Sequence, residues 1–244
     1  MQVVLSIILF LFCSTGQAAM NMPGSFTRKG NMSIKNIEQA VAAQASLAIV
    51  QSTGVQNNTS MNNISSTFST PSTAGSLIWV ALAGDLGFPT SLIDNQLNVY
   101  NRFTFAQNTD AVAIFASSNT TGGVTWVKAT WGSSSANLVF SITEVSGITQ
   151  SSGTAIVNAT GNTAHIETST MTLSGVSHVA FCAATENTGT APTFSEGNGY
   201  TVQKSFPANQ QLHTETRITT SDTPCDGNLS AAGISWAISG QIWR

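Results

Sequence analysis

Hydrophobic and polar residues follow one another in short runs along most of this chain, which predicts β-strands. Between residues 76 and 147 the runs are rich in Val, Ile, Phe, Trp and Thr, and each ends in Gly, Asn, Asp or Ser. β-Branched and aromatic residues favour strands, and the closing residues favour turns. The pattern continues almost to Arg244, and helical periodicity is absent after Ser46. The sequence therefore predicts an all-β protein, a single antiparallel β-sandwich that is jelly-roll-like and has about eleven or twelve strands.

The predicted strands differ in how their faces are buried. The run at 76–83 is continuously apolar and contains Trp79, which predicts a central strand covered on both faces. Other strands are predicted at 46–52, 64–70, 97–105, 111–116, 124–131, 137–145, 176–184, 200–206, 212–219 and 234–243, with weaker signals between 154 and 172. No internal repeat is evident. We expect one β domain at 46–244, since sandwiches of this size commonly form single domains.

The first 45 residues have a different character. Residues 3–13 are almost wholly apolar, but this run is too short to span a bilayer as a helix. It is followed by Gly16-Gln17-Ala18, which fits the small residues of a signal-peptidase site. This predicts a signal peptide at 1–18, although no Lys or Arg precedes the apolar run, and the alternative is a buried strand or helix. Residues 19–45 are then a leader or linker.

Charge is scarce in this chain, and its scarcity excludes one class of function. Only 8% of the residues are charged, the net charge is −3, and the few Lys and Arg residues form no cluster. A nucleic-acid-binding surface needs such a cluster, so we expect no nucleic-acid partner. We also expect no membrane span, because no apolar run is long enough.

Two cysteines remain once the signal peptide is removed, Cys182 and Cys225. An even number of cysteines in an exported chain predicts a disulfide between them. In a reducing compartment the same two residues would be buried free thiols.

Six segments carry a resemblance to a known kind of domain. They read AIVQS at 48–52, PSTAGSLIWVALA at 71–83, SLIDNQLNVY at 91–100, TGGVTWVKATW at 121–131, ITEVSGI at 142–148 and WAISGQIWR at 236–244. In their order, these segments resemble a β-sandwich domain of secreted bacterial surface proteins and of phage and metagenomic structural proteins. The resemblance covers about 46–244 and implies an accessory, adhesion or surface module. Its motifs are turns and core positions, so it transfers no catalytic residue.

The sequence contains no recognised catalytic motif and no zinc-binding pair of histidines. His165, His178 and His213 have no partner histidine at the spacing of a zinc site. His178 lies in an apolar run and is interpreted as a core histidine. Glu144, Glu186 and Glu196 follow predicted strands, and a pair of them facing each other would suit a glycosidase. As solvated charges at strand ends they need no such role, and we expect no enzyme.

One turn offers oxygen ligands that a calcium ion would accept. Asp94, Asn95 and Asn98 lie close together in sequence, and Ca²⁺ binds several such oxygens. An Asp-Asn pair is also typical of a turn without any ion. We therefore expect no cofactor other than a structural calcium ion at this turn.

The predicted strand at 124–131 has one polar face that carries a tryptophan. Its alternation places Val127, Ala129 and Trp131 on one face and Trp126, Lys128 and Thr130 on the other. An exposed tryptophan beside polar groups can stack on a sugar ring or anchor a protein partner. The alternative is that residues 20–45 or a neighbouring strand cover it.

Together these features predict a non-catalytic surface or binding module that is secreted or displayed on the cell surface. Its partner would be a glycan or a protein surface, bound through Trp126, Lys128 and Thr130. The alternative is a structural subunit of a virion or appendage, such as a decoration or fibre protein. A third interpretation is a secreted polysaccharide-active enzyme.

Overall fold

The computed structural model describes residues 46–85, 87–118, 120–135, 137–149, 155–172, 175–187, 192–207 and 210–244, all within one compact unit. These residues form sixteen strands, paired antiparallel in every sheet, and no helix. The prediction of an all-β antiparallel protein is confirmed. Within the described residues there is therefore no helix that could cross a membrane. The predicted signal peptide at 1–18 and leader at 19–45 lie outside the described residues.

The first eight strands form two sheets. They are β1 (Ala48–Asn57), β2 (Met61–Thr67), β3 (Leu77–Gly84), β4 (Ser91–Asp94), β5 (Asn101–Gln107), β6 (Ala111–Ser117), β7 (Trp126–Ser135) and β8 (Leu138–Ser146). The first large sheet has the order β1-β8-β3-β6-β5, and the first small sheet has the order β2-β7-β4. The pairing of β1 with β8, β2 with β7 and β3 with β6 is jelly-roll-like. The fifth strand, however, pairs with the sixth in the large sheet.

The last eight strands repeat this arrangement. They are β9 (Ala155–Gly161), β10 (His165–Glu167), β11 (His178–Asn187), β12 (Phe194–Glu196), β13 (Thr201–Phe206), β14 (Gln210–Thr219), β15 (Asp226–Leu229) and β16 (Trp236–Trp243). The second large sheet has the order β9-β16-β11-β14-β13, and the second small sheet has the order β10-β15-β12. Each strand of the first half thus has a counterpart eight strands later.

The two halves also share a register shift in the pairing of the edge strand of each large sheet. The pairing of β5 with β6 shifts between Arg102 and Thr104, and that of β13 with β14 shifts between Val202 and Lys204. Beyond the shift Phe105 pairs with Ala113 in the first half, and Ser205 pairs with His213 in the second. Residues 46–244 therefore form a structural tandem repeat, and the strand pairing identifies equivalent positions in its halves.

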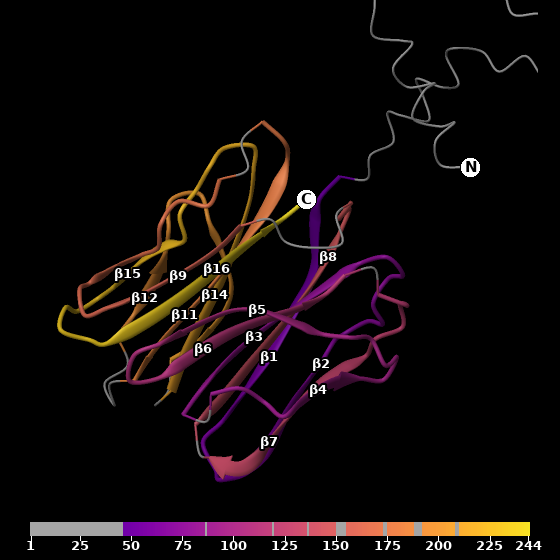
Figure 1. The fold of residues 1–244 in the computed structure, drawn as a ribbon, viewed down its shortest axis with the longest axis horizontal. Coiled ribbons are helices and arrows are strands. Elements are labelled where there is room, and N and C mark those ends of the chain that lie inside the picture. The colour runs from indigo at the N-terminus through magenta and orange to yellow at the C-terminus, as the bar shows by residue number, and fades with distance from the viewer. Residues whose placement is uncertain are drawn as a thin grey trace, which may run out of the picture. The chain divides into compact units, whose positions relative to one another are not determined.

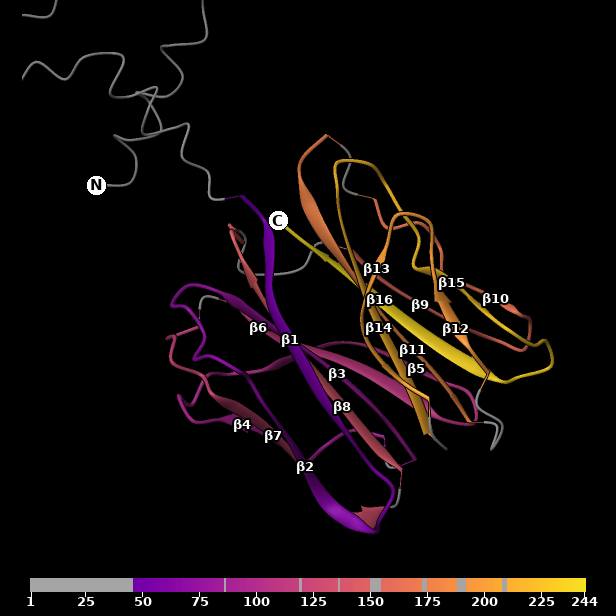
Figure 2. The same cartoon turned by 180° about the vertical axis from the view of Figure 1, so that it is seen from behind.

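The four sheets stack in layers, with the two large sheets in the middle (Figures 1 and 2). The large sheets pack face to face around a core in which Trp79 of β3 stacks on Phe181 of β11, with ring centroids 4.7 Å apart. Each small sheet covers the opposite face of its own large sheet through a further apolar core. Every residue of β3 and of β16 is consequently buried, which confirms the predicted burial of residues 76–83 on both faces.

The strand count exceeds the expected eleven or twelve because the sequence does not reveal the shortest strands. β12 has three residues and β15 has four. Such strands are too short and too polar to give an alternating pattern, and their contacts in the small sheet define them. The predicted strand at 97–105 also begins later, at Asn101, because the preceding residues form a turn around Asp94.

A disulfide between Cys182 and Cys225 fastens the second small sheet to the second large sheet. Cys182 lies in β11, and Cys225 immediately precedes β15. Gly240 of the neighbouring β16 leaves room for the bond, since a Cβ there would collide with Cys225 Sγ. The predicted pairing is therefore present, and it crosslinks the layer that has the shortest strands.

Replacing both cysteines by alanine should lower the free energy of unfolding by about 4 kcal/mol. The bond joins residues 43 positions apart, and the chain-entropy model gives this value for a loop of that length. Urea denaturation of the double variant and of the oxidised protein measures the difference. Mass spectrometry of the unreduced protein should find neither thiol open to alkylation, and two alkylated cysteines would contradict the bond.

Candidate functional site

The outer face of the first small sheet carries a tryptophan in its middle strand. Trp126, Lys128 and Thr130 are half-buried on β7, while Val127 and Ala129 between them are buried in the core beneath. The predicted alternation of this strand is therefore present. Across the sheet β2 and β4 add further side chains to this face. The register places Thr67 beside Trp126, Ser65 and Ile93 beside Lys128, and Asn63 and Ser91 beside Thr130.

The turn after β4 is held by the buried carboxylate of Asp94. Its Oδ1 accepts hydrogen bonds from the backbone N–H groups of Gln96 and Asn98, at 2.8 and 3.1 Å. Its Oδ2 accepts from Asn98 Nδ2 and from the Tyr100 hydroxyl, both at 2.8 Å. The turn forces Leu97 to a φ of 59° and leaves its side chain 83% exposed.

The predicted calcium ligands are engaged by protein donors in this turn. Asp94 accepts the four hydrogen bonds just given. Asn95 Oδ1 accepts from the backbone N–H of Thr125 at 2.8 Å, and Asn98 Oδ1 accepts from that of Thr121 at 3.0 Å. Among the described residues no group of three or more His, Cys, Asp and Glu side chains could hold a metal ion. The arrangement is that of a hydrogen-bonded turn, and calcium binding stays a prediction.

A second constellation lies in the second half, where sequence reasoning identified no site. The Ser205 hydroxyl on β13 lies 2.8 Å from His213 Nδ1 on β14, and His213 Nε2 lies 3.0 Å from Glu186 Oε1 on β11. Ser205 is exposed, whereas His213 and Glu186 are each only 1% exposed. The ring of Phe194 stacks on the imidazole with centroids 4.3 Å apart. Serine, histidine and glutamate therefore form one hydrogen-bonded chain.

A buried carboxyl group lies on the same face of β14, two residues further along. Glu215 is 1% exposed, and its Oε2 accepts a hydrogen bond from the backbone N–H of Gly197 at 3.1 Å. Burial, helped by the nearby carboxylates of Asp226 and Glu196, raises the pKa of Glu215 to about 8, although the hydrogen bond from Gly197 acts in the opposite direction. The carboxyl is therefore largely protonated at neutral pH.

Glu144 and His178, two further residues named from the sequence, are buried and hydrogen-bonded within the fold. Glu144 is fully buried in the first half and accepts hydrogen bonds from the Thr73 backbone, the Ser76 hydroxyl and Gln51 Nε2, at 2.7 to 2.9 Å. The candidate glutamates are thus divided, since Glu144 lies in one half and Glu186 and Glu196 in the other. His178 is a buried core residue, as expected, with Nδ1 3.0 Å from the Val176 carbonyl oxygen.

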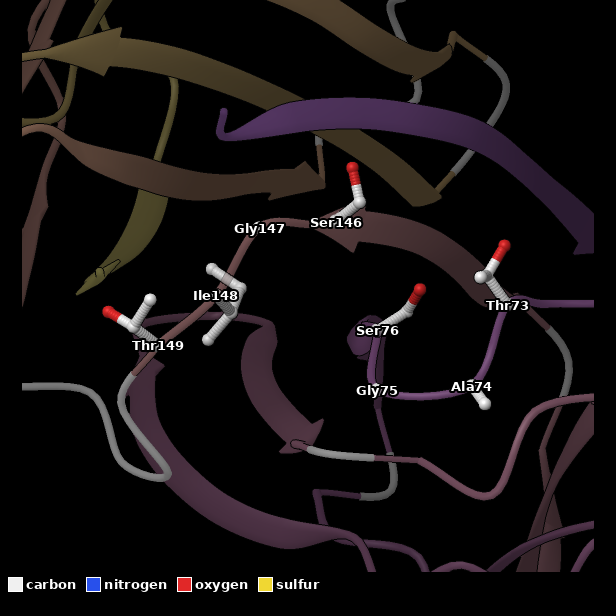
Figure 3. A pocket seen from close by; sticks show the side chains of 8 residues that line it. All are labelled: Thr73, Ala74, Gly75, Ser76, Ser146, Gly147, Ile148 and Thr149. Atoms are coloured by element: carbon white, nitrogen blue, oxygen red, sulfur yellow. The ribbon is translucent and has the colours of Figure 1, made fainter. Parts of the chain in front are cut away.

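A pocket of about 320 Å³ lies beside Glu144, between residues 73–76 and 146–149 (Figure 3). No charged side chain lines it. The Ser76 hydroxyl donates to Glu144 Oε1, and the Ser146 hydroxyl donates to the Ala48 carbonyl oxygen. These two hydroxyls are therefore engaged in hydrogen bonds within the protein. The residues that line the pocket include neither Trp126 nor Ser205.

The Ser205 chain escaped the sequence analysis because its members come from three strands. In the sequence Ser205 and His213 are simply eight positions apart, in a chain rich in serine. The hairpin of β13 and β14 places them directly opposite each other. Predicting that register would have required the position of the shift after Val202, which no local pattern marks.

Glu215→Gln should make stability less sensitive to pH. Because the folded-state pKa is about 8 and the ordinary value is 4.5, the stabilisation that the protonated carboxyl provides is complete below about pH 4.5 and is lost as the pH rises through 8. Glutamine stays neutral, and one pKa unit corresponds to about 1.4 kcal/mol. The variant should therefore match the parent at pH 4.5 and exceed it by a few kcal/mol above pH 8.

Urea denaturation at several pH values between 4.5 and 9 measures this difference, with Asp85→Asn, at an exposed carboxylate of the first half, as the control. Parallel stability curves for the parent protein and for Glu215→Gln would contradict the raised pKa.

Comparisons of this chain with protein-family models, with curated proteins and with solved structures give no match. Because the two halves share strand order, residues at equivalent positions in the two halves can be compared with each other. A polar residue in one half that is apolar in the other is not required by the shared arrangement of strands. Both constellations can be judged by this criterion.

Proposed function

We propose that the chain is an exported surface module that binds carbohydrate on the outer face of the first small sheet. The observation that carries this is the row of Trp126, Lys128 and Thr130, half-buried in the middle strand of the outermost layer. An indole can stack on the apolar face of a sugar ring, while the neighbouring ammonium and hydroxyl groups hydrogen-bond to its hydroxyls.

The equivalent surface of the second half supports this proposal. On the second small sheet the outward residues include His165 on β10, Asn228 on β15 and Ser195 on β12, paired with one another across the strands. This row has no Trp, Tyr or Phe side chain. A small sheet of this architecture therefore does not need an outward tryptophan, and selection for binding explains Trp126 better than packing does.

Export is supported by the disulfide. Disulfides persist in oxidising compartments and are rare in the cytosol, and Cys182 and Cys225 are bonded. Together with the small-residue site that ends at Ala18, this favours a secreted or cell-surface location.

A protein partner is the second candidate, and exposed apolar side chains at one end of the sheet favour it. Ile93 on β4 is 43% exposed, and Leu97 and Val99 in the following turn are 83% and 73% exposed. The Asp94 hydrogen bonds hold this turn rigid, so little conformational entropy would be lost when a partner binds it.

Trp126→Ala should weaken glycan binding by roughly tenfold, since an aromatic stacking contact contributes about 1–1.5 kcal/mol. Because Trp126 is half-buried, its loss should lower stability less than that of the fully buried Trp79, for which about 3–5 kcal/mol is expected. Glycan-array binding and thermal denaturation of both variants measure these effects.

Asn228→Ala, on the equivalent outer surface of the second small sheet, is the matched control and should leave binding unchanged. The proposal fails if Trp126→Ala binds glycans as the parent does. It fails equally if Trp126→Ala destabilises as strongly as Trp79→Ala, because Trp126 would then be a core residue. Retained binding of a protein partner through Leu97 and Val99 would favour the second candidate.

A further inference from the structure

We propose that Ser205 is an activated nucleophile that cleaves small acyl esters, with His213 as its general base and Glu186 as the residue that positions the imidazole. The Ser205 hydroxyl is exposed at the edge of the second large sheet, and the two groups that would activate it are buried behind it. An exposed nucleophile, a base within hydrogen-bond reach and a third group that orients the base together form the arrangement of a catalytic triad.

The hydrogen bonds select the tautomer that this role requires. Glu186 Oε1 accepts a hydrogen bond from the protonated Nε2 of His213, at 3.0 Å, so Nδ1 keeps its lone pair. Nδ1 can then accept the proton of the Ser205 hydroxyl, 2.8 Å away. The two ring nitrogens are used in the opposite order from the trypsin-like triad, where Nε2 faces the serine. Either nitrogen of a neutral imidazole can act as the base.

Neighbouring side chains hold Glu186 and His213 in position. With its amide in the orientation that satisfies its neighbours, the side chain of Gln211 donates to Glu186 Oε1 and to the Pro192 carbonyl oxygen. Phe194 of β12 stacks on the imidazole at an interplanar angle of 13°. The base is therefore oriented before any substrate binds, which is the condition for efficient proton transfer.

The equivalent positions in the first half carry no such chain. By register, Phe105 corresponds to Ser205 and Ala113 corresponds to His213. Gly84 corresponds to Glu186, because these residues pair with Ala111 and Gln211 at equivalent points of β6 and β14. The same arrangement of strands therefore forms with apolar residues. A buried polar group has a desolvation cost even when it is paired, so the fold alone does not account for this chain.

The chemical steps need only ester and water. Ser205 Oγ adds to the ester carbonyl carbon while its proton passes to His213 Nδ1. The C–O bond to the alcohol then breaks, and the leaving oxygen takes that proton. Water attacks the acyl-serine and gives a proton to Nδ1, which returns it to Ser205 Oγ as the carboxylic acid departs. Because β13 is an edge strand, part of its backbone N–H groups face away from β14, where they can donate to the oxyanion.

A fluorophosphonate probe tests this on the full chain, because it labels only activated serines. The probe should modify Ser205, located by peptide mass spectrometry, and should not modify Ser195, an exposed serine on β12. Ser205→Ala should abolish labelling, and the circular dichroism spectrum of the variant should show that it remains folded. Hydrolysis of a p-nitrophenyl acetate probe should fall at least about 10²-fold in the same variant, the contribution usual for base-assisted attack.

Glu186→Gln separates positioning from packing, because glutamine retains the size of the side chain. The rate constant of Ser205 modification at saturating probe should fall at least about tenfold, with the probe concentration for half-saturation unchanged. The proposal is overturned if the probe labels Ser205 no faster than it labels Ser195. It is also overturned if Ser205 is labelled no faster in the native protein than in the heat-denatured protein. Equal modification rates in the parent and in a folded Glu186→Gln variant overturn it as well.

Discussion

The face-to-face packing of the two large sheets is the constraint on which the other layers depend. It buries one face of each large sheet, where Trp79 stacks on Phe181, and the opposite face then has to be covered by a small sheet. Strands in the middle of this stack meet no water on either side, which favours apolar side chains and polar side chains that have hydrogen-bond partners within the protein. Glu144 illustrates the second case, because its buried carboxylate accepts three hydrogen bonds from Thr73, Ser76 and Gln51.

Solvated sheet surface is therefore confined to the outer faces of the small sheets and to the strand edges, and both proposed sites lie there. The two small sheets are not equally built. The first contains the seven-residue β2 and the ten-residue β7 over an extensive apolar core, and this core is filled without the side chain of Trp126. The second has strands of three or four residues, and a covalent bond from Cys225 to β11 supplements its packing. A binding face is best placed on the more rigid of the two.

The sequence predicts properties that depend on neighbouring residues and misses those that depend on pairing between distant strands. The burial of residues 76–83 follows from a continuous apolar run, and the two-faced character of β7 follows from strict alternation between Trp126 and Trp131. The Cys182–Cys225 bond follows from the two cysteines that remain once the predicted signal peptide of an exported chain is removed. The sequence does not reveal the tandem repeat because equivalent positions of the two halves carry different residue types. Gly84, for example, corresponds to Glu186, and Phe105 corresponds to Ser205. The Ser205 chain is missed for the same reason, since the strand pairing that assembles it has no local signature.

Comparison of the halves also shows what the polar residues of the second half cost. Where the first half buries Ala113 and Phe115, the second buries His213 and the raised-pKa carboxyl of Glu215. Each replacement gives up apolar burial and adds a group that must be desolvated. The disulfide stabilises the same half and offsets part of this loss. The positions that hold Ser205, His213 and Glu215 in the second half hold Phe105, Ala113 and Phe115 in the first. The shared arrangement of strands therefore does not require these polar residues, and their desolvation is a cost that the second half alone bears.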